Sequence, residues 1–262
     1  MVKSSEWVEF FGAPGVGKTT LYKEVVKKMP KDWITEQNAI FKSKMTFVNR
    51  NSLIFFFYKT LYSIPQTAKF LSKIHEPINH RVLLYDFIKD FPVFYKFSLD
   101  CIFNSSSTSY RKTTAFLQFL ETAKKRTLIK KSNLNIKVLS DESLCQRMFT
   151  QLSEEEIDEE QLVEKYFKNI PFIGRLVHVK LNEDEIVYRI QKRFKQTNKI
   201  NYMNTGLSSE ELLHQTKKYT SYVKTGIKVL EQRGVTILQI DSSLSVDQNV
   251  SKIVDFLNKN QK

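Results

Sequence analysis

Three glycines, a lysine and a hydroxyl side chain lie close together near the start of the chain, in the segment GAPGVGKT (12–19). This segment matches G-x-x-x-x-G-K-[ST] at every fixed position, a pattern typical of loops that bind nucleotide phosphates. Glycines let the backbone curl until successive N–H groups point at phosphate oxygens, and a following helix adds positive potential. We therefore expect a loop that binds a nucleoside triphosphate. Its predicted contacts are Gly12, Ala13, Pro14, Gly15, Val16, Gly17, Lys18, Thr19 and Thr20.

The segments on either side of this loop support the same interpretation. The run WVEFF (7–11) is typical of a buried strand, and Leu21, Val25 and Met29 recur at the four-residue spacing of a helix. Strand, loop and helix therefore follow one another in the order that a phosphate-binding loop requires. In such a loop the lysine reaches the terminal phosphates, and the hydroxyl after it joins the shell of Mg²⁺.

A second requirement of this chemistry is a carboxylate for the magnesium shell, usually placed after a neighbouring apolar strand. Asp86, Asp141 and Asp241 each follow an apolar run. The periodicity around Asp86 is helical, which favours a surface carboxylate. Asp241 precedes the last helix, so we expect it either to cap that helix or to lie near the nucleotide base.

Asp141 and its neighbour Glu142 are the preferred pair of carboxylates. We predict that Asp141 holds Mg²⁺ together with the Thr19 hydroxyl, while Glu142 faces the attacking group. The alternative is that Asp141 caps the helix that follows and that Glu142 lies favourably in its first turn.

A basic helix supplies candidate groups for stabilising the transferred phosphate. Arg189 and Arg193 are four residues apart and therefore share a helix face. Guanidinium groups suit phosphoryl oxygens because they are planar, charged and bidentate. The polar, loop-like segment that follows, 195–206, predicts a lid over residues 189–206. The alternative is a solvated basic face beside the acidic residues 183–185.

The order of the predicted elements indicates an α/β protein with a parallel sheet of about five strands and helices on both faces, in three layers. The predicted strands are 7–11, 32–36, 135–141, 175–181 and 235–240. The segment 38–132 is a helical insertion with helices near 51–74, 79–103 and 109–131 and with breaks near Pro65, Pro77, Pro92 and residues 104–109. We expect a single domain over 1–262, with the insertion on the acceptor side. Ligands of such a sheet bind at the carboxyl ends of its strands.

Composition limits the class of protein. The 41 basic and 28 acidic residues give a net charge of +13, but the lysines are scattered, so we do not expect nucleic acid as a partner. Cys101 and Cys145 form no disulfide framework or metal motif, and no segment resembles a signal peptide or a membrane span. We expect a cytoplasmic protein without a membrane partner. His75 and His80 lack the neighbours of a metal site.

These features resemble the thymidylate kinase and deoxynucleoside kinase group of P-loop kinases. The resemblance rests on the loop at 12–20, on Glu36, on SDES (140–143) and on RIQKR (189–193), and it extends through HQTKKYTSYV (214–223) to the C-terminal helix. It implies the P-loop kinase fold and the use of ATP with Mg²⁺.

The resemblance also implies residues on the acceptor side. Glu36 falls where the family has a general base or an acceptor-binding carboxylate, and Gln118 falls where a side chain can read a nucleobase. The family usually has an arginine directly after the acidic residue of the third strand. Here Glu142 takes that position, and Arg147 follows one helical turn later as the candidate for acceptor binding.

The sequence therefore predicts an ATP-dependent kinase that acts on a nucleoside, a nucleoside monophosphate or a similar hydroxylated metabolite, with a homodimer left open. The predicted catalytic residues are Lys18, Glu36, Asp141, Glu142, Arg189 and Arg193. One alternative is a P-loop ATPase that works as a switch or partner-binding module. A nucleic-acid end kinase is suggested by the net charge alone. No Asn-Lys-x-Asp motif is present, which disfavours a GTPase.

Overall fold

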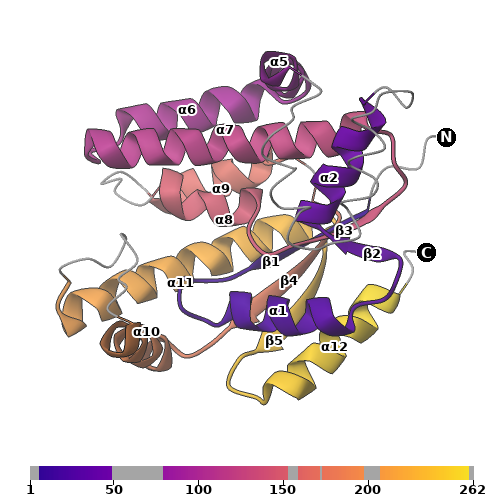
Figure 1. Cartoon of the computed structure of the whole chain (residues 1–262). Coiled ribbons are helices and arrows are strands. Elements are labelled where there is room, and N and C mark those ends of the chain that lie inside the picture. Colours follow the sequence, from indigo (N-terminus) through magenta and orange to yellow (C-terminus); the bar gives the residue numbers. More distant parts are fainter. Residues whose placement is uncertain (1–5, 49–78, 153–158, 172, 198–206, 260–262) are drawn as a thin grey trace. The chain divides into compact units, whose positions relative to one another are not determined.

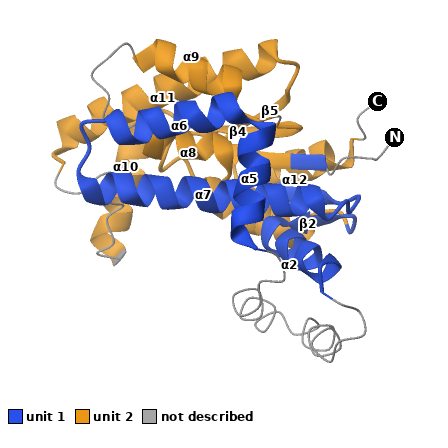
Figure 2. Cartoon of the chain, turned by 90° about the horizontal axis from the view of Figure 1, so that it is seen from above, with its two compact units in different colours: residues 1–7, 31–140 blue, residues 8–30, 141–262 orange. Residues whose placement is uncertain are grey.

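A computed structural model describes residues 6–48, 79–152, 159–171, 173–197 and 207–259 of the chain. The chain divides into two compact units, which are coloured separately in Figure 2. The first unit contains residues 1–7 and 31–140, and the second contains 8–30 and 141–262. The predicted helix at 51–74 and most of the loop-like part of the predicted lid, 198–206, lie outside the described residues.

The predicted five-stranded sheet is confirmed, with the order β2-β3-β1-β4-β5. Its strands are β1 (Glu6–Phe11), β2 (Trp33–Thr35), β3 (Lys137–Ser140), β4 (Arg175–Lys180) and β5 (Thr236–Asp241). β2 pairs with β3, and β4 pairs with both β1 and β5, in each case in parallel. The apolar strands β1 and β4 lie inside the sheet because both of their faces can then be covered.

The second unit shows why the end of β1 carries apolar side chains on both faces. Phe10 contacts Tyr22 of α1 (Lys18–Lys28), whereas Phe11 contacts Phe149 of α8 (Leu144–Gln151) and Phe167 of α9 (Glu159–Asn169). Successive side chains of a strand point to opposite faces, so both faces of β1 are covered by helices. This arrangement gives the three layers that the sequence predicts.

The remaining helices of the second unit complete these layers (Figure 1). α12 (Val246–Asn258) packs beside α1 on one face, and α11 (Ser209–Gln232) packs against α9 on the other. α11 approaches α9 closely at Gly226, where a Cβ atom would lie 2.3 Å from Cε2 of Phe167. α11 begins with a capping box between Ser208 and Glu211. α10 (Glu183–Thr197) follows β4 and packs against α11.

The first unit is mainly helical. It contains α2 (Glu36–Thr46), α5 (His80–Asp90), α6 (Pro92–Asn104) and α7 (Ser109–Lys131), and both α5 and α6 pack against α7. The predicted break near Pro92 divides the helical stretch 79–103 into α5 and α6, because Pro92 disfavours a helical residue before it and starts α6 as its first residue. Aromatic residues of this region, such as Phe119, are buried in its core, which is their more common role.

Asp86 has the surface position expected of it. It lies in α5 and forms an ion pair with Lys131 of α7. Within the described residues, no helix is long and apolar enough to cross a bilayer.

Candidate active site

The glycines of the loop between β1 and α1 give this loop its sharp curvature. Gly15 and Gly17 have φ angles of 93° and 99°, which side chains other than glycine rarely adopt. At Gly12, a Cβ atom would lie 2.3 Å from the carbonyl oxygen of Val179 in β4. The loop therefore needs glycine at Gly12 for space, and at Gly15 and Gly17 for conformation.

Lys18 is held inside the loop as the first residue of α1. Its ammonium group donates hydrogen bonds to the carbonyl oxygens of Gly12, at 2.9 Å, and Ala13, at 3.1 Å. The residue is 6% exposed, and this burial lowers the pKa of Lys18 from 10.5 to about 8, although the carboxylates of Glu142 and Asp141 oppose the shift. A partly desolvated cation inside a glycine-rich loop is well placed to bind an anion.

Thr19 and Asp141, the two residues predicted to hold Mg²⁺, meet in the structure. The exposed Thr19 hydroxyl donates a hydrogen bond to the Asp141 carboxylate. Burial nevertheless raises the pKa of Asp141, and the neighbouring charge of Glu142 raises it further. Oδ1 of Asp141 is buried and has no hydrogen-bond partner within the described part of the chain.

This buried oxygen indicates that the pair fits a cation. Mg²⁺ prefers oxygen ligands and commonly takes one or two from the protein, with phosphates and water completing its octahedron. A carboxylate oxygen without a donor, beside a hydroxyl at the end of a phosphate-binding loop, supplies such ligands. Glu142 is exposed and forms a long ion pair, 3.8 Å, with the half-buried Arg147.

The structure excludes the alternative in which Asp141 caps the helix that follows β3. The helix begins at Leu144 with Ser143 as its N-cap residue, so neither Asp141 nor Glu142 caps it or lies in its first turn. The N-terminus of α8 instead meets Glu9 of β1, a residue that the sequence analysis did not single out. A carboxylate inside the apolar run WVEFF was the signal that could have identified it.

α10 brings Arg189 to the loop. Atoms of Ile186 and Ile190 lie 3.0 Å or less from the position of a Cβ atom on Gly15, so this helix packs directly on the loop. Arg189 donates from Nη1 to Oγ of Ser242 at 2.9 Å and from Nη2 to the Ser242 carbonyl at 3.1 Å. It also forms an ion pair with Glu185 at 3.1 Å.

Arg193, one turn after Arg189, has a different environment. It is exposed, whereas Nη1 of Arg189 lies 3.5 Å from the position of a Cβ atom on Gly17. The structure therefore places Arg189, and not Arg193, against the loop. The predicted loop-like segment at 195–206 begins later than expected, because α10 continues to Thr197.

Asp241 lies beside a cavity next to Arg189. The cavity has a volume of about 470 Å³, and its lining comprises Leu181, Asn182, Glu185, Arg189, Asp241 and Ser243. Asp241 accepts hydrogen bonds from the backbone and hydroxyl of Ser243, at 2.9 and 2.7 Å. It does not cap α12, because Ser245 is the N-cap residue of that helix. A position of Asp241 near the nucleotide base stays a prediction.

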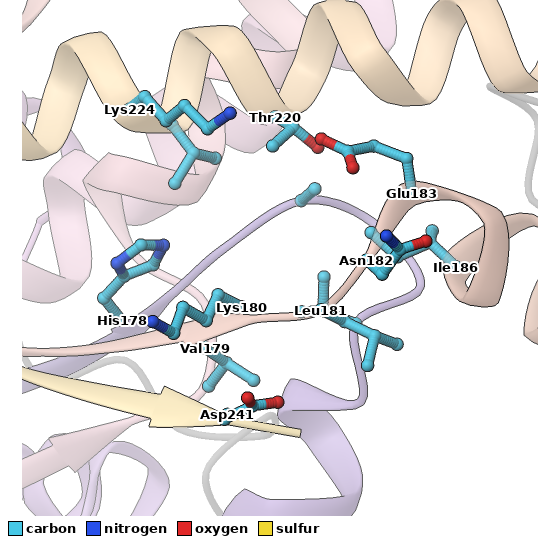
Figure 3. Close-up of a pocket in the computed structure, with 13 residues that line it drawn as sticks. His178, Val179, Lys180, Leu181, Asn182, Glu183, Ile186, Thr220, Lys224 and Asp241 are labelled. Carbon is cyan, nitrogen blue, oxygen red and sulfur yellow. The ribbon is translucent and has the colours of Figure 1, made fainter. Parts of the chain in front are cut away.

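A second cavity lies on the side of the loop formed by Ala13 and Val16 and has a volume of about 260 Å³. Figure 3 shows His178 of β4 and Thr220 and Lys224 of α11 around it. Burial, helped by the charge of Lys180, lowers the pKa of His178 from 6.5 to about 4. His178 is therefore neutral at pH 7, and it was not among the predicted site residues.

Of the residues predicted for the acceptor side, Glu36 and Gln118 belong to the first unit and Arg147 belongs to the second. Glu36 is the first residue of α2, and the hydroxyl of Ser140, at the end of β3, donates a short hydrogen bond to its carboxylate. The strand that was predicted to include Glu36 ends at Thr35, which caps α2. Gln118 is half-buried in α7. The roles of Glu36, Gln118 and Arg147 toward an acceptor stay predictions.

Comparisons with known proteins add structural neighbours. No protein-family model and no curated protein matches the sequence. The chain is similar to a deoxyadenosine kinase from M. mycoides with the products dCMP and a flexible dCDP bound, at 14% identity and a TM-score of 0.48, over 96% of this chain and 98% of that chain. It is also similar to the same kinase with dATP bound, at 15% identity and a TM-score of 0.46, over 97% and 100%.

Proposed function

We propose that this chain is an ATP-dependent kinase that phosphorylates a nucleoside, a nucleoside monophosphate or a similar hydroxylated small molecule. The observation that carries the proposal is the arrangement at the end of β1. There the buried ammonium of Lys18 lies in the glycine-rich loop, and the next residue, Thr19, meets a carboxylate with a free buried oxygen. Few arrangements other than a site for a metal–polyphosphate complex use these groups together.

Each group has a distinct role in this proposal. The loop amides and Lys18 would bind the β- and γ-phosphates, and Thr19 and Asp141 would hold Mg²⁺, which would neutralise charge on the phosphates. Arg189 stabilises the negative charge of the transferred group, because its guanidinium lies at Gly17 in the loop. The cavity beside Arg189 and Asp241 would take the base end of the nucleotide.

A hydroxyl acceptor requires a group that receives its proton, whereas the oxygen of a phosphate acceptor is already ionised. The acceptor oxygen forms a bond to the γ-phosphorus as the bond between that phosphorus and the β–γ bridging oxygen breaks, and the proton of a hydroxyl acceptor passes to a carboxylate. Glu36 is the preferred base, because its hydrogen bond with Ser140 fixes its orientation. Glu142 is the second candidate, since it is exposed next to Asp141. Arg193 and the proposed lid, 189–206, would exclude water from the transferred group.

A screen for acceptor-dependent ADP release tests this function. Purified protein is incubated with Mg-ATP and, separately, with nucleosides, nucleoside monophosphates and sugars. We expect ADP release that depends on one of these classes and that is abolished in Lys18→Ala. Lys27→Ala, an exposed lysine of the same helix paired with Glu24, is the matched control and should retain full activity.

Two results would contradict the proposal. ADP release of the same rate with and without every acceptor would indicate an ATPase. Near-native turnover in a correctly folded Lys18→Ala protein would show that the loop is not the nucleotide site.

A further inference from the structure

The carboxylate of Glu9 occupies a place in β1 where an apolar side chain is expected. Glu9 is 0% exposed and, by the alternation of the strand, faces the same side as Phe11, which contacts Phe149 of α8. Burial of a carboxylate costs several kcal/mol unless hydrogen bonds compensate for the lost water. A leucine or valine would fill this position without that cost, so the charge itself requires an explanation.

The N-terminus of α8 supplies the compensating hydrogen bonds. Oε1 of Glu9 accepts from the backbone N–H groups of Ser143 at 3.1 Å, Cys145 at 2.8 Å and Gln146 at 3.4 Å. α8 has no side-chain cap of its own and no acidic residue in its first turn. The first N–H groups of a helix have no partner within the helix and carry positive potential. Glu9 therefore acts as a cap from more than 130 residues away.

This contact connects the two segments that form the magnesium pair. β1 carries Glu9 and leads through the loop to Thr19, whereas the α8 N-terminus follows Asp141 by only two residues. The Glu9 carboxylate thus ties the strand before Thr19 to the backbone after Asp141. We propose that Glu9 is a positioning residue that holds Asp141 in place to bind Mg²⁺ with Thr19; this role rests on the proposed function.

Glu9→Leu and Glu9→Gln test this role, with Gln151→Leu as the matched control. Gln151 lies at the other end of α8, is 2% exposed, and has no hydrogen bond from its amide group in the described structure. Binding of a fluorescent ADP analogue is titrated with Mg²⁺ for each protein. Amide hydrogen exchange at residues 143–146 is measured without nucleotide.

Glu9→Leu should raise the Mg²⁺ concentration for half-maximal binding about 10–100-fold, the range seen when groups that orient metal ligands are removed. Glu9→Gln keeps an acceptor for the amides and should show a smaller rise. Both variants should bind the analogue without Mg²⁺ as the wild type does, because Lys18 and the loop are intact. Exchange at 143–146 should be faster in Glu9→Leu, and Gln151→Leu should match the wild type in every measurement.

Three outcomes would overturn the role of Glu9. An unchanged Mg²⁺ requirement in both Glu9 variants would show that Glu9 does not position Asp141, even if α8 loosens. If Gln151→Leu raised the Mg²⁺ concentration for half-maximal binding by the same factor, the effect of the Glu9 variants would be a general loss of packing and not a loss of positioning. A wild type that binds no Mg-nucleotide would overturn the proposed function itself, and the role of Glu9 with it. If Glu9→Leu does not fold, the titration of Glu9→Gln decides alone.

Discussion

Arg189 donates hydrogen bonds to both the hydroxyl and the carbonyl oxygen of Ser242, at 2.9 and 3.1 Å. Ser242 directly follows β5, so this contact fixes a guanidinium of α10 against the loop after the last strand. Oγ of Ser242 would lie 3.1 Å from a Cβ atom on Gly17. Contacts within the protein therefore orient the arginine beside the glycine-rich loop, which would reduce the reorganisation needed for catalysis.

Arg189→Ala should lower kcat by about 1,000-fold, because an arginine that acts on the transferred phosphoryl group contributes on that scale. Nucleotide affinity should change much less, since the charge acts mainly in the transition state. Steady-state kinetics with the acceptor found by the screen check this.

Arg193→Ala should have a smaller effect on kcat than Arg189→Ala, and Arg193→Lys should recover part of the lost kcat. Lys195→Ala, an exposed cation of the same helix, should behave as the wild type. A normal kcat in Arg189→Ala would make the arginine a structural clamp for Ser242.

Asp141→Asn should lower turnover about 100-fold or more and raise the Mg²⁺ concentration needed for half-maximal rate. The reason is that the amide presents one neutral oxygen where the carboxylate offers a charged one. Asp241→Asn is the control, because its carboxylate serves the turn through Ser243. Rates measured over a range of Mg²⁺ concentrations compare the two variants. If Asp241→Asn showed the larger shift, the metal would belong to the end of β5.

Glu36→Gln should lower kcat about 100-fold or more if Glu36 is the base, with ATP binding unchanged. Ser140→Ala removes the donor that orients this carboxylate and should lower kcat by a smaller factor in the same direction. Acceptor and ATP titrations of both variants separate the effects on kcat and KM. A normal kcat for Glu36→Gln would exclude Glu36 as the base. The same measurement on Glu142→Gln would then test the second candidate.

Sequence patterns predicted the parts of this site that depend on local structure. The loop, its flanking strand and its helix are continuous in sequence, so the motif and the periodicity were enough to place Lys18 and Thr19. Asp141 could be selected because a carboxylate after an apolar strand reaches the sheet edge where the loop lies. The break at Pro92 followed from the restricted conformation of the residue before proline.

Contacts between distant segments could not be predicted in this way. Arg189 and Arg193 lie four residues apart on one helix face, so the sequence treats them alike. Only the packing of α10 on Gly15 shows that Arg189 is the one beside the loop. The partners of Glu9 are 134–137 residues away in the sequence. The sequence pattern therefore could not explain why a charged residue lies inside this strand. Asp241 was one candidate to cap α12, but Ser245 caps that helix and the Asp241 carboxylate accepts a hydrogen bond from Ser243 instead.

His178 should make the protein less stable in acid. Its pKa is lowered from 6.5 to about 4 by burial and by Lys180, so between these values the unfolded chain takes up a proton that the folded chain does not. Stability from this group is therefore complete above pH 6.5 and decreases as the pH falls toward 4, by about 3 kcal/mol in total. Urea unfolding at several pH values measures this change in the free energy of unfolding. His178→Gln should remove this part of the pH dependence, and His214→Gln, an exposed histidine of α11, should not.

Nucleotide affinity should fall as the pH rises above 8, because Lys18 must carry its proton to bind phosphate. Without ligand, burial lowers the pKa of Lys18 to about 8; bound phosphates favour the charged form and raise this pKa again. Below pH 8 the lysine is protonated in both states, so affinity is constant. Above pH 8 binding requires uptake of a proton, and Kd should rise about tenfold per pH unit until the pKa of the complex is reached.

Titrations of ADP between pH 7.5 and about 9.5, where its phosphates are ionised, measure this slope of Kd against pH. Lys18→Arg stays charged over the whole range and should show no slope, whereas Lys27→Ala should keep the slope of the wild type. A flat profile in the wild type, with binding intact, would mean that the charge of Lys18 does not contribute to nucleotide binding.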